Sequence, residues 1–313
     1  MSPEQMGITL MLARLYRELL NRFLKVTFRF WQHLGIHITL CHFYEPIPDT
    51  RTLRDGLWQH YSKLIGVNFD EKVQLDLLSH FRKTFKGKYD RFPMEKTSMP
   101  CEYYIKNGIF ESVDGEILYC MIGHFRPRRI IEIGSGYSTY LAAKAILNNQ
   151  KDNYDYLCDL TAIEPFPNKI LQKGFPGLSR LVQKPVQEVP YSEFEKLRDN
   201  DMLLIDSSHV LKIDSDVQYL YLEVLPRLDK GVLISFHDIF LPAPYRKEWV
   251  LKNHWFWNEQ YLLQAFLTFN SCFEILWMGS YMHLMHSEEL RAAFSSYDKE
   301  RDWPGSFWIR KVK

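Results

Sequence analysis

The sequence predicts an α/β protein built on a doubly wound, mostly parallel β-sheet with helices on both faces. Six short apolar runs follow one another between residues 129 and 278: RIIEI, LTAIEP, RLVQK, MLLIDS, GVLISFHD and FEILWMG. The segments between them are long enough for helices, and continuous apolar strands are typical of sheets covered on both faces. A glycine turn after the first run marks the strand edge where such sheets bind ligands.

Length and composition set the frame for this sheet. With 313 residues, the chain can form one large domain and a smaller extension. We expect a helical extension over residues 1–99 and the α/β domain over residues 100–313, joined at the polar segment KGKYDRFPMEKTSMP. The net charge of +1 argues against a nucleic-acid binder. Five dispersed cysteines without a C-x-x-C pair favour reduced thiols and a cytoplasmic protein.

The first helix is expected over residues 8–34. One stripe of it is polar and largely basic, with apolar residues around the rest: Arg14, Arg17, Asn21, Lys25, Arg29 and Gln32. The segment is too charged for a secretory leader, and no stretch is apolar enough to span a bilayer. It can pack on the domain or on a second copy in a homodimer, or lie on a membrane surface as a peripheral contact. Apolar residues at helical spacing are usually core, which favours packing.

A second helical segment, DEKVQLDLLSHFRKTF, follows in the extension. Asp70 stands directly before the apolar periodicity and predicts an N-cap for this helix.

The turn after the first apolar run reads Glu132-Ile-Gly134-Ser-Gly136. The two glycines let the backbone turn tightly and approach a ligand closely. A dinucleotide turn would carry a third glycine at position 139, which is Thr139 here. Glu132 would repel a diphosphate but suits a cofactor with a sulfonium and an ammonium group, and Glu164, which ends the second run, suits ribose hydroxyls. The pattern favours S-adenosylmethionine over NAD.

The segments EIGSGYST, AIEPFP, LLIDSSHV and HDIFLP resemble class I S-adenosylmethionine-dependent methyltransferases, in the methyltransferase-domain subgroup related to catechol and sugar O-methyltransferases. The resemblance covers residues 100–313 and implies a Rossmann-like sheet that ends in an antiparallel hairpin of FEILWMG and PGSFWIRK. It implies that Glu164 binds the ribose and that Gln187 lies near the adenine. The residues that it places at the methionine end of the cofactor are Glu132, Gly134, Ser135, Gly136 and Ser138.

The fourth and fifth runs end in four polar residues: Asp206, His209, His237 and Asp238. Neighbouring parallel strands bring such residues to one edge of the sheet, beside the cofactor, so we also count Asp206 with the cofactor site. The resemblance implies that Asp206 and Asp238, with His237, bind a divalent metal ion. It further implies that His209, His237 and Asp238 act in catalysis, with a histidine as the base. A histidine at 237, where the family carries an acid, disfavours magnesium and admits a softer ion or none. A structural role remains open for each histidine, and a capping role for Asp238.

These observations favour an enzyme that methylates a hydroxyl on a small molecule or glycan. The first alternative is an NAD-dependent oxidoreductase, and the second is a catalytically silent scaffold. The aromatic segment from Trp249 to Phe269 has helical spacing and predicts a core helix, while Trp257 and Glu259 are left open between packing and a site role.

Overall fold

The computed structural model describes residues 3–313 of the protein. They divide into two compact units, a first that ends at Asp55 and a second from Gly56 to Lys313. The first unit contains α1 (Pro3–His33) and the short helix η1 (Thr50–Thr52). The expected boundary between residues 99 and 100 lies inside the second unit and stays a prediction about domains.

Helix α1 begins before and ends close to the range expected for it. None of its residues whose side chains are described is buried within the unit, although many are apolar, including Leu15, Leu19 and Phe23. The packing interpretation and the membrane-surface interpretation of α1 both remain predictions. Among residues 3–313, no helix is long and apolar enough to cross a membrane.

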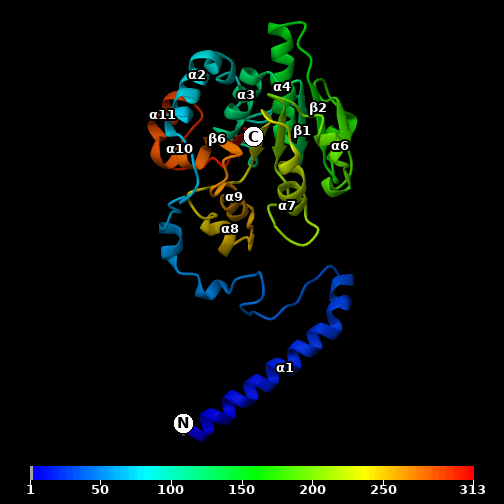
Figure 1. Ribbon diagram of the computed structural model, residues 1–313, viewed down its shortest axis with the longest axis vertical. Helices are drawn as coiled ribbons and strands as arrows, with labels where there is room; N and C mark the ends of the chain where they lie inside the picture. The colour runs from blue at the N-terminus through cyan, green and yellow to red at the C-terminus, as the bar shows by residue number, and fades with distance from the viewer. Residues whose placement is uncertain (1–2) are drawn as a thin grey trace. The chain divides into compact units, whose positions relative to one another are not determined.

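The second unit carries one sheet of seven strands in the order β3-β2-β1-β4-β5-β7-β6 (Figure 1). The first five strands of this order are parallel, and β7 runs antiparallel to both of its neighbours. The strands are β1 (Arg129–Ile133), β2 (Asp159–Ile163), β3 (Arg180–Val182), β4 (Met202–Ile205), β5 (Leu233–Phe236), β6 (Phe273–Met278) and β7 (Phe307–Lys311). The six predicted strands and the antiparallel hairpin at the end of the sheet are confirmed.

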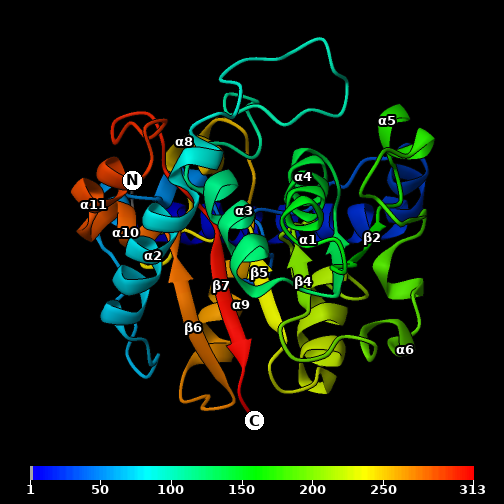
Figure 2. The same cartoon turned by 90° about the horizontal axis from the view of Figure 1, so that it is seen from above.

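Helices cover the sheet on both faces (Figure 2). The longer ones are α2 (Glu71–Tyr89), α3 (Asp114–Phe125), α4 (Tyr137–Asp152), α9 (Glu259–Leu267), α10 (Gly279–Met285) and α11 (Ser287–Ala293). The shorter ones are α5 (Lys169–Lys173), α6 (Tyr191–Phe194), α7 (Asp216–Tyr219), α8 (Lys247–Leu251), η2 (Asp55–Gln59), η3 (Val186–Glu188), η4 (Leu220–Val224) and η5 (Leu225–Arg227).

Strand alternation explains the two faces. Successive strand residues point to opposite sides, so Ile130 joins one apolar core with α2, α3 and α4. Ile131 joins a second core with α6, α7 and α9. Two cores separated by one sheet are the doubly wound arrangement that the sequence predicts.

Helix α2 belongs to the same compact unit as the sheet. The side chain of Asp70 accepts a hydrogen bond from Lys72 N at 2.8 Å, which confirms the predicted N-cap. At the other end of the helix, Tyr89 Oη donates to Ala293 O at 3.0 Å and fastens α2 to the end of α11. All five cysteines are unpaired.

Candidate active site

The turn after β1 shows which of its two glycines the backbone needs. Gly134 has φ +78°, and a Cβ atom there would lie 1.9 Å from the carbonyl oxygen of Asp206. Gly136 has φ −178°, an extended conformation that any residue adopts, and a Cβ atom there would meet nothing within 4 Å. Gly134 is therefore required by the chain itself, whereas Gly136 leaves open space beside the turn.

Thr139 explains why the third glycine of a dinucleotide turn is absent. Its side chain is fully buried, and its Oγ1 accepts a hydrogen bond from Gly136 N at 2.9 Å. The hydroxyl thus satisfies the first free backbone N–H at the start of α4, which in a dinucleotide turn would face a phosphate.

A cavity of about 480 Å³ lies at the carboxyl ends of β1, β2 and β4. It is large enough for a drug-sized ligand. Four of the predicted cofactor residues line it: Gly134, Glu164, Gln187 and Asp206. Loop residues after β4 also line it, and sequence reasoning missed them although they follow the predicted strand directly: Ser207, Ser208, Lys212, Asp214, Ser215 and Asp216.

The other predicted cofactor residues, Glu132, Ser135, Gly136 and Ser138, are not among the lining residues of this cavity. Glu132 is the penultimate residue of β1 and is 1% exposed, with no hydrogen-bonding partner for either carboxylate oxygen among the described residues. The Oγ atoms of Ser135 and Ser207 are also buried and unpartnered. Burial raises the pKa of Glu132 to about 7. Because a buried polar atom without a partner is destabilising, these oxygens indicate a ligand with hydrogen-bond donors.

The reacting rim consists of Asp206, His209, His237 and Asp238, at the ends of β4 and β5. Asp206 N donates to Ile133 O and His237 N donates to Ile205 O, both at 2.9 Å, so the strand ladder continues directly into the rim. His209 Nε2 lies 3.4 Å from Asp206 Oδ1 and 3.6 Å from Asp238 Oδ2. His237 Nδ1 lies 3.4 Å from Asp206 Oδ1 and 3.7 Å from Asp238 Oδ1. All four predicted rim residues therefore lie together.

Backbone geometry at two of these residues is unusual. His209 has φ +59° and Asp238 has φ +56°, in the left-handed region that side-chain-bearing residues seldom adopt. Such conformations are found where the surrounding structure holds a functional side chain in place.

The Glu259 carboxylate, whose role the sequence did not settle, holds the His209 ring from the side away from Asp206 and Asp238. Glu259, at the first position of α9, is 1% exposed, and its Oε2 lies 2.9 Å from His209 Nδ1. The Trp257 ring packs against the imidazole with its centroid 4.4 Å away. Since Nδ1 is committed to Glu259, Nε2 is the nitrogen that faces Asp206 and Asp238.

His237 has a similar support from α3. Its Nε2 lies 3.4 Å from Asp114 Oδ2, and the carboxylate of Asp114 also accepts hydrogen bonds from Gly305 N and Ser306 N. His237 Nδ1 is buried without a hydrogen-bonding partner. The sequence does not reveal this role of Asp114, because nothing in it joins Asp114 to a residue more than a hundred positions later.

The rim is a tightly coupled set of charges. Although burial alone would lower it, the carboxylates of Asp206 and Glu259 raise the pKa of His209 to about 10. Burial also opposes protonation of His237, but Asp238 and Asp206 raise its pKa well above the usual range. Burial disfavours the charged form of Asp206, yet the two rings lower the pKa of its carboxyl. The carboxylates of the rim therefore favour the protonated form of both imidazoles.

Three of the rim residues have the geometry of metal ligands. One ligand atom from each of Asp206, His209 and Asp238 lies within 4.8 Å of the others. This set contains His209, whereas the sequence suggested His237 as the third ligand beside Asp206 and Asp238. Two carboxylates and one imidazole suit Mn²⁺, Fe²⁺ or Zn²⁺ better than Mg²⁺, which prefers oxygen ligands.

Comparison with known proteins bears on this site. A family described as "Methyltransferase domain" matches residues 131–239, from β1 to just beyond Asp238. An uncharacterised protein of Archaeoglobus fulgidus is 33% identical over 170 residues, which cover 51% of this chain and 73% of that protein. The chain belongs to the methyltransferase-domain family of class I S-adenosylmethionine-dependent enzymes.

Solved structures resemble this methyltransferase only remotely. The O-methyltransferase from Bacillus cereus, in complex with SAH, is 14% identical with a TM-score of 0.36, covering 76% of this chain and 91% of that one. A TDP-rhamnose 3′-O-methyltransferase of calicheamicin biosynthesis is 13% identical with a TM-score of 0.30, covering 60% and 86%. At these scores, neither structure says anything about the substrate of this methyltransferase.

Proposed function

We propose that this methyltransferase transfers a methyl group to a hydroxyl of a small molecule or glycan, with a divalent metal ion held at the rim. One observation carries the proposal. Asp206 lines the cofactor cavity and also belongs to the set of possible metal ligands with His209 and Asp238, so an ion at the rim would lie beside the cofactor.

The buried oxygens beside the β1 turn suit S-adenosylmethionine. When bound, this cofactor supplies an activated methyl group, so the protein needs only to align the acceptor and manage its proton. We assign the ammonium end of the cofactor to Glu132 and Ser135, and its ribose to Glu164, which lines the cavity. The open space beside Gly136 leaves room for close approach, and Ser138 and Gln187 remain proposed contacts.

The rim residues divide between ion binding and proton transfer. Glu259 holds His209 in the tautomer that presents Nε2 to an ion, the usual arrangement for a metal-bound histidine. His209 cannot then serve as the base as well. We assign proton acceptance to His237 Nδ1, which is buried, makes no hydrogen bond and lies 3.4 Å from Asp206 Oδ1. In the absence of an ion the neighbouring carboxylates keep this ring protonated, so proton acceptance requires that Asp206 and Asp238 be engaged by a cation.

Two alternatives are less well supported. Against an NAD-dependent oxidoreductase, Thr139 occupies the third glycine position and Glu132 lies directly before the turn. Against a silent scaffold, the rim keeps Asp206, His209 and Asp238 together with the geometry of metal ligands.

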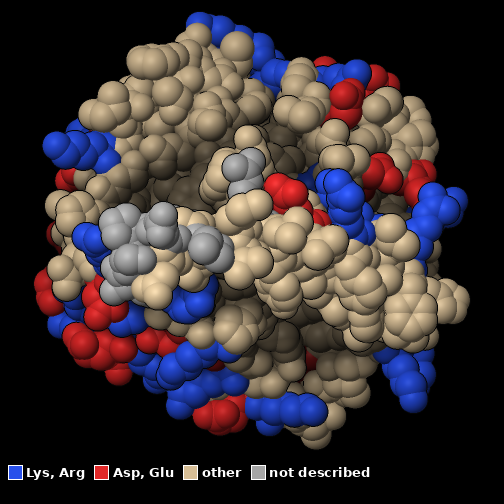
Figure 3. All heavy atoms as spheres, turned by 90° about the horizontal axis from the view of Figure 1, so that it is seen from below, with Lys and Arg blue, Asp and Glu red and all other residues tan. Residues whose placement is uncertain are grey.

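Partners and location are proposed from composition alone. On the face shown in Figure 3, acidic and basic side chains are interspersed among uncharged residues, which gives no support for nucleic-acid binding. A cytoplasmic location, a homodimer and a peripheral membrane contact through α1 stay predictions.

The test combines cofactor binding with turnover. Calorimetry should show binding of S-adenosylmethionine, and methyl-labelled cofactor should label an acceptor in fractionated cell extract when Mn²⁺ is present. Asp206→Asn and Asp238→Asn should abolish labelling. Asp238→Asn should leave cofactor affinity unchanged, and the exposed control Asp155→Asn should behave as wild type. His209→Ala should lose Mn²⁺ affinity, and His237→Ala should keep it but lower the rate roughly a hundredfold.

Three results would count against this assignment. A thermal shift with NAD but none with S-adenosylmethionine would favour the oxidoreductase. Full activity in EDTA with an inactive Asp238→Asn would indicate a metal-independent His–Asp mechanism. Full activity in both Asp238→Asn and His209→Ala would refute the whole rim.

A further inference from the structure

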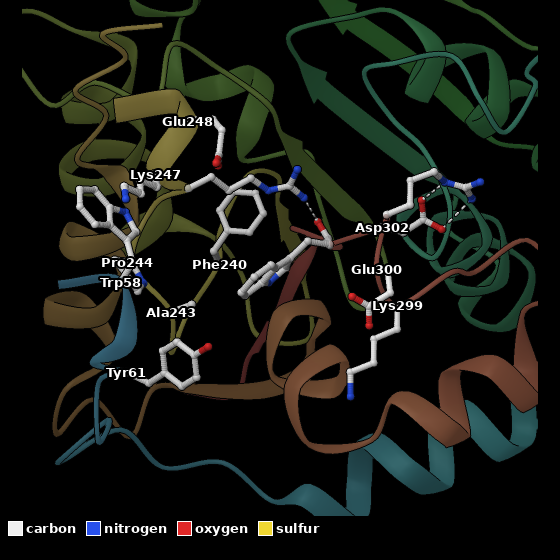
Figure 4. A pocket seen from close by; sticks show the side chains of 13 residues that line it. Trp58, Tyr61, Phe240, Ala243, Pro244, Lys247, Glu248, Lys299, Glu300 and Asp302 are labelled. Carbon is white, nitrogen blue, oxygen red and sulfur yellow. Dashed lines mark hydrogen bonds and ion pairs between the residues drawn. The ribbon is translucent and has the colours of Figure 1, made fainter. Parts of the chain in front are cut away.

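Two cavities adjoin on the side of the rim formed by β5 and the loop before β7. The inner cavity, about 110 Å³, is lined by His237 and Asp238 among others. The outer cavity, about 290 Å³, is lined by aromatic and charged side chains and is shown in Figure 4. Both are lined by Phe240, Arg246 and Trp303, so the outer cavity leads toward the reacting residues.

Arg246 lies at the boundary of the two cavities, and its guanidinium makes no direct ion pair. Asp114 and Asp238 also line the inner cavity, but their carboxylates lie against His237. Among the described residues, no carboxylate oxygen lies within 4.0 Å of its guanidinium, in contrast to Arg301, which makes a two-point ion pair with Asp302. Arg246 Nη2 donates to Trp303 O at 2.7 Å, while Nε is buried with no partner. Burial also lowers the pKa of the guanidinium. Arg246 is half-buried, and its buried, unused Nε–H is unfavourable unless an acceptor such as an anion binds it.

Aromatic rings hold the guanidinium of Arg246 in place. It lies 5.1 Å from the ring centroid of Phe240 and 5.3 Å from that of Trp249, a cation–π arrangement on two sides. The two rings are nearly perpendicular to each other, at 83°, and with the bond to Trp303 O they restrict the movement of the guanidinium. A guanidinium is a planar fork that suits two-point binding of a carboxylate or phosphate.

The outer cavity has rigid aromatic walls. Trp58 Nε1 donates to Tyr245 O at 2.9 Å, and Trp303 Nε1 donates to Ser280 Oγ at 2.9 Å. Figure 4 shows Trp58 and Tyr61 on one side of the cavity and Lys299 and Glu300 on the other, with Phe240 between them. Fixed aromatic faces favour planar rings and the apolar faces of sugars.

The acidic residues around the cavity do not neutralise Arg246. Asp302 is paired with Arg301, while Glu248 and Glu300 are exposed, where water and salt screen their charge. Three other cations line the outer cavity, and each has a contact of its own. Arg301 is paired with Asp302, Lys299 Nζ donates to Ser287 Oγ at 3.0 Å, and Lys247 Nζ lies 5.6 Å from the ring centroid of Trp58.

We propose that Arg246 binds an oxyanion of the acceptor, so that the substrate is a ring compound bearing both a hydroxyl and a carboxylate or phosphate. The proposal rests on the proposed function, because it takes the rim as the place of reaction. The oxyanion binds Arg246, the ring lies in the outer cavity, and the hydroxyl extends through the inner cavity to His237 and Asp238.

Fluorine NMR of 4-fluorobenzoate with the full-length protein tests the site without turnover. We expect saturable line broadening with wild type and none with 4-fluorobenzamide, the neutral isostere. Arg246→Gln should weaken 4-fluorobenzoate binding roughly tenfold or more, since hydrogen bonds to charged groups are worth at least that. Lys299→Gln, a matched loss of charge in the same cavity, should bind as wild type.

Each outcome decides the matter. Inorganic phosphate that displaces the probe at equal or lower concentration indicates a phosphorylated acceptor, and failure to displace it indicates a carboxylated ring. Equal binding by wild type and Arg246→Gln, or no saturable broadening in wild type, overturns the proposal. Should Arg246→Gln not fold, Arg246→Lys keeps the charge but loses the fork and should bind the probe at an intermediate level. If the protein transfers no methyl group but Arg246→Gln still weakens binding of 4-fluorobenzoate, the proposed function is refuted and the anion site at Arg246 is not.

Discussion

Substitution of Gly134 by alanine is the sharpest test of the turn after β1. The added Cβ would lie 1.9 Å from Asp206 O, whereas ordinary contacts begin at 3.4 Å, so the two atoms must separate by about 1.5 Å. The left-handed conformation costs about 1–2 kcal/mol for alanine. Displacement of packed backbone costs a further 1–3 kcal/mol, roughly.

We therefore expect Gly134→Ala to lose about 2–5 kcal/mol of stability, which lowers the melting temperature by roughly 4–20 °C for a domain of this size. Since Asp206 must move, affinity for S-adenosylmethionine should fall as well. Differential scanning calorimetry and cofactor titration measure the two effects. Gly136→Ala is the matched control: its added Cβ meets no protein atom, so stability should change little while cofactor affinity falls. A Gly134→Ala protein with wild-type melting temperature and affinity would refute the reasoning.

Three further predictions follow from buried charges and from α1. Glu259→Ala should weaken Mn²⁺ binding roughly 10- to 100-fold. Glu259→Gln should weaken it less, because the amide oxygen still accepts a hydrogen bond from His209 Nδ1. Paramagnetic titration measures both affinities, and equal Mn²⁺ affinities in wild type and the two variants would contradict the positioning role of Glu259. Burial raises the pKa of Glu116 to about 7 from an unfolded value near 4.5, so the folded state favours the protonated form, and stability should fall as pH rises from 4.5 to 7, by about 3 kcal/mol. Urea unfolding at pH 5 and pH 8 should show this loss of unfolding free energy in wild type and a smaller loss in Glu116→Gln. An equal change in unfolding free energy between the two pH values in both proteins would count against the prediction. If α1 packs on protein, deletion of residues 1–34 should lower the melting temperature or dissociate a homodimer, and sedimentation with anionic vesicles should not change. Loss of vesicle binding with an unchanged melting temperature would instead support the membrane-surface interpretation.

The sequence predicts the sheet well because strand identity is a local signal. The apolar runs mark β1 to β6, and the polar residues that end them locate the rim, since parallel strands align their carboxyl ends. That regularity brings Asp206 and His237 to adjacent strand ends without any knowledge of the loops.

The residues that hold the rim histidines could not be predicted, because the tertiary fold brings them to the rim from distant parts of the chain. Glu259 reaches His209 across fifty positions, and Asp114 reaches His237 from a helix that precedes β1. The sequence shows only that Thr139 stands in place of a third glycine, whereas the structure shows that its hydroxyl accepts a hydrogen bond from Gly136 N at the helix start. Arg246 escaped notice because the significance of a charged residue there depends on the absence of a nearby carboxylate, which only the tertiary structure reveals.

The position of β7 in the sheet has a consequence for synthesis of the chain. β7 pairs with β5 on one side and β6 on the other. Until residues 307–311 have emerged from the ribosome, β5 is paired only with β4 and β6 is paired with no other strand. The 70 residues from 237 to 306 must be made while β5 presents an open edge, which takes roughly 4–14 s at ordinary translation rates. Open edges pair readily with strands of other chains. A nascent chain paused in this interval is therefore a preferred client for chaperones that bind exposed strands, and slow translation of this segment would favour aggregation over completion of the sheet.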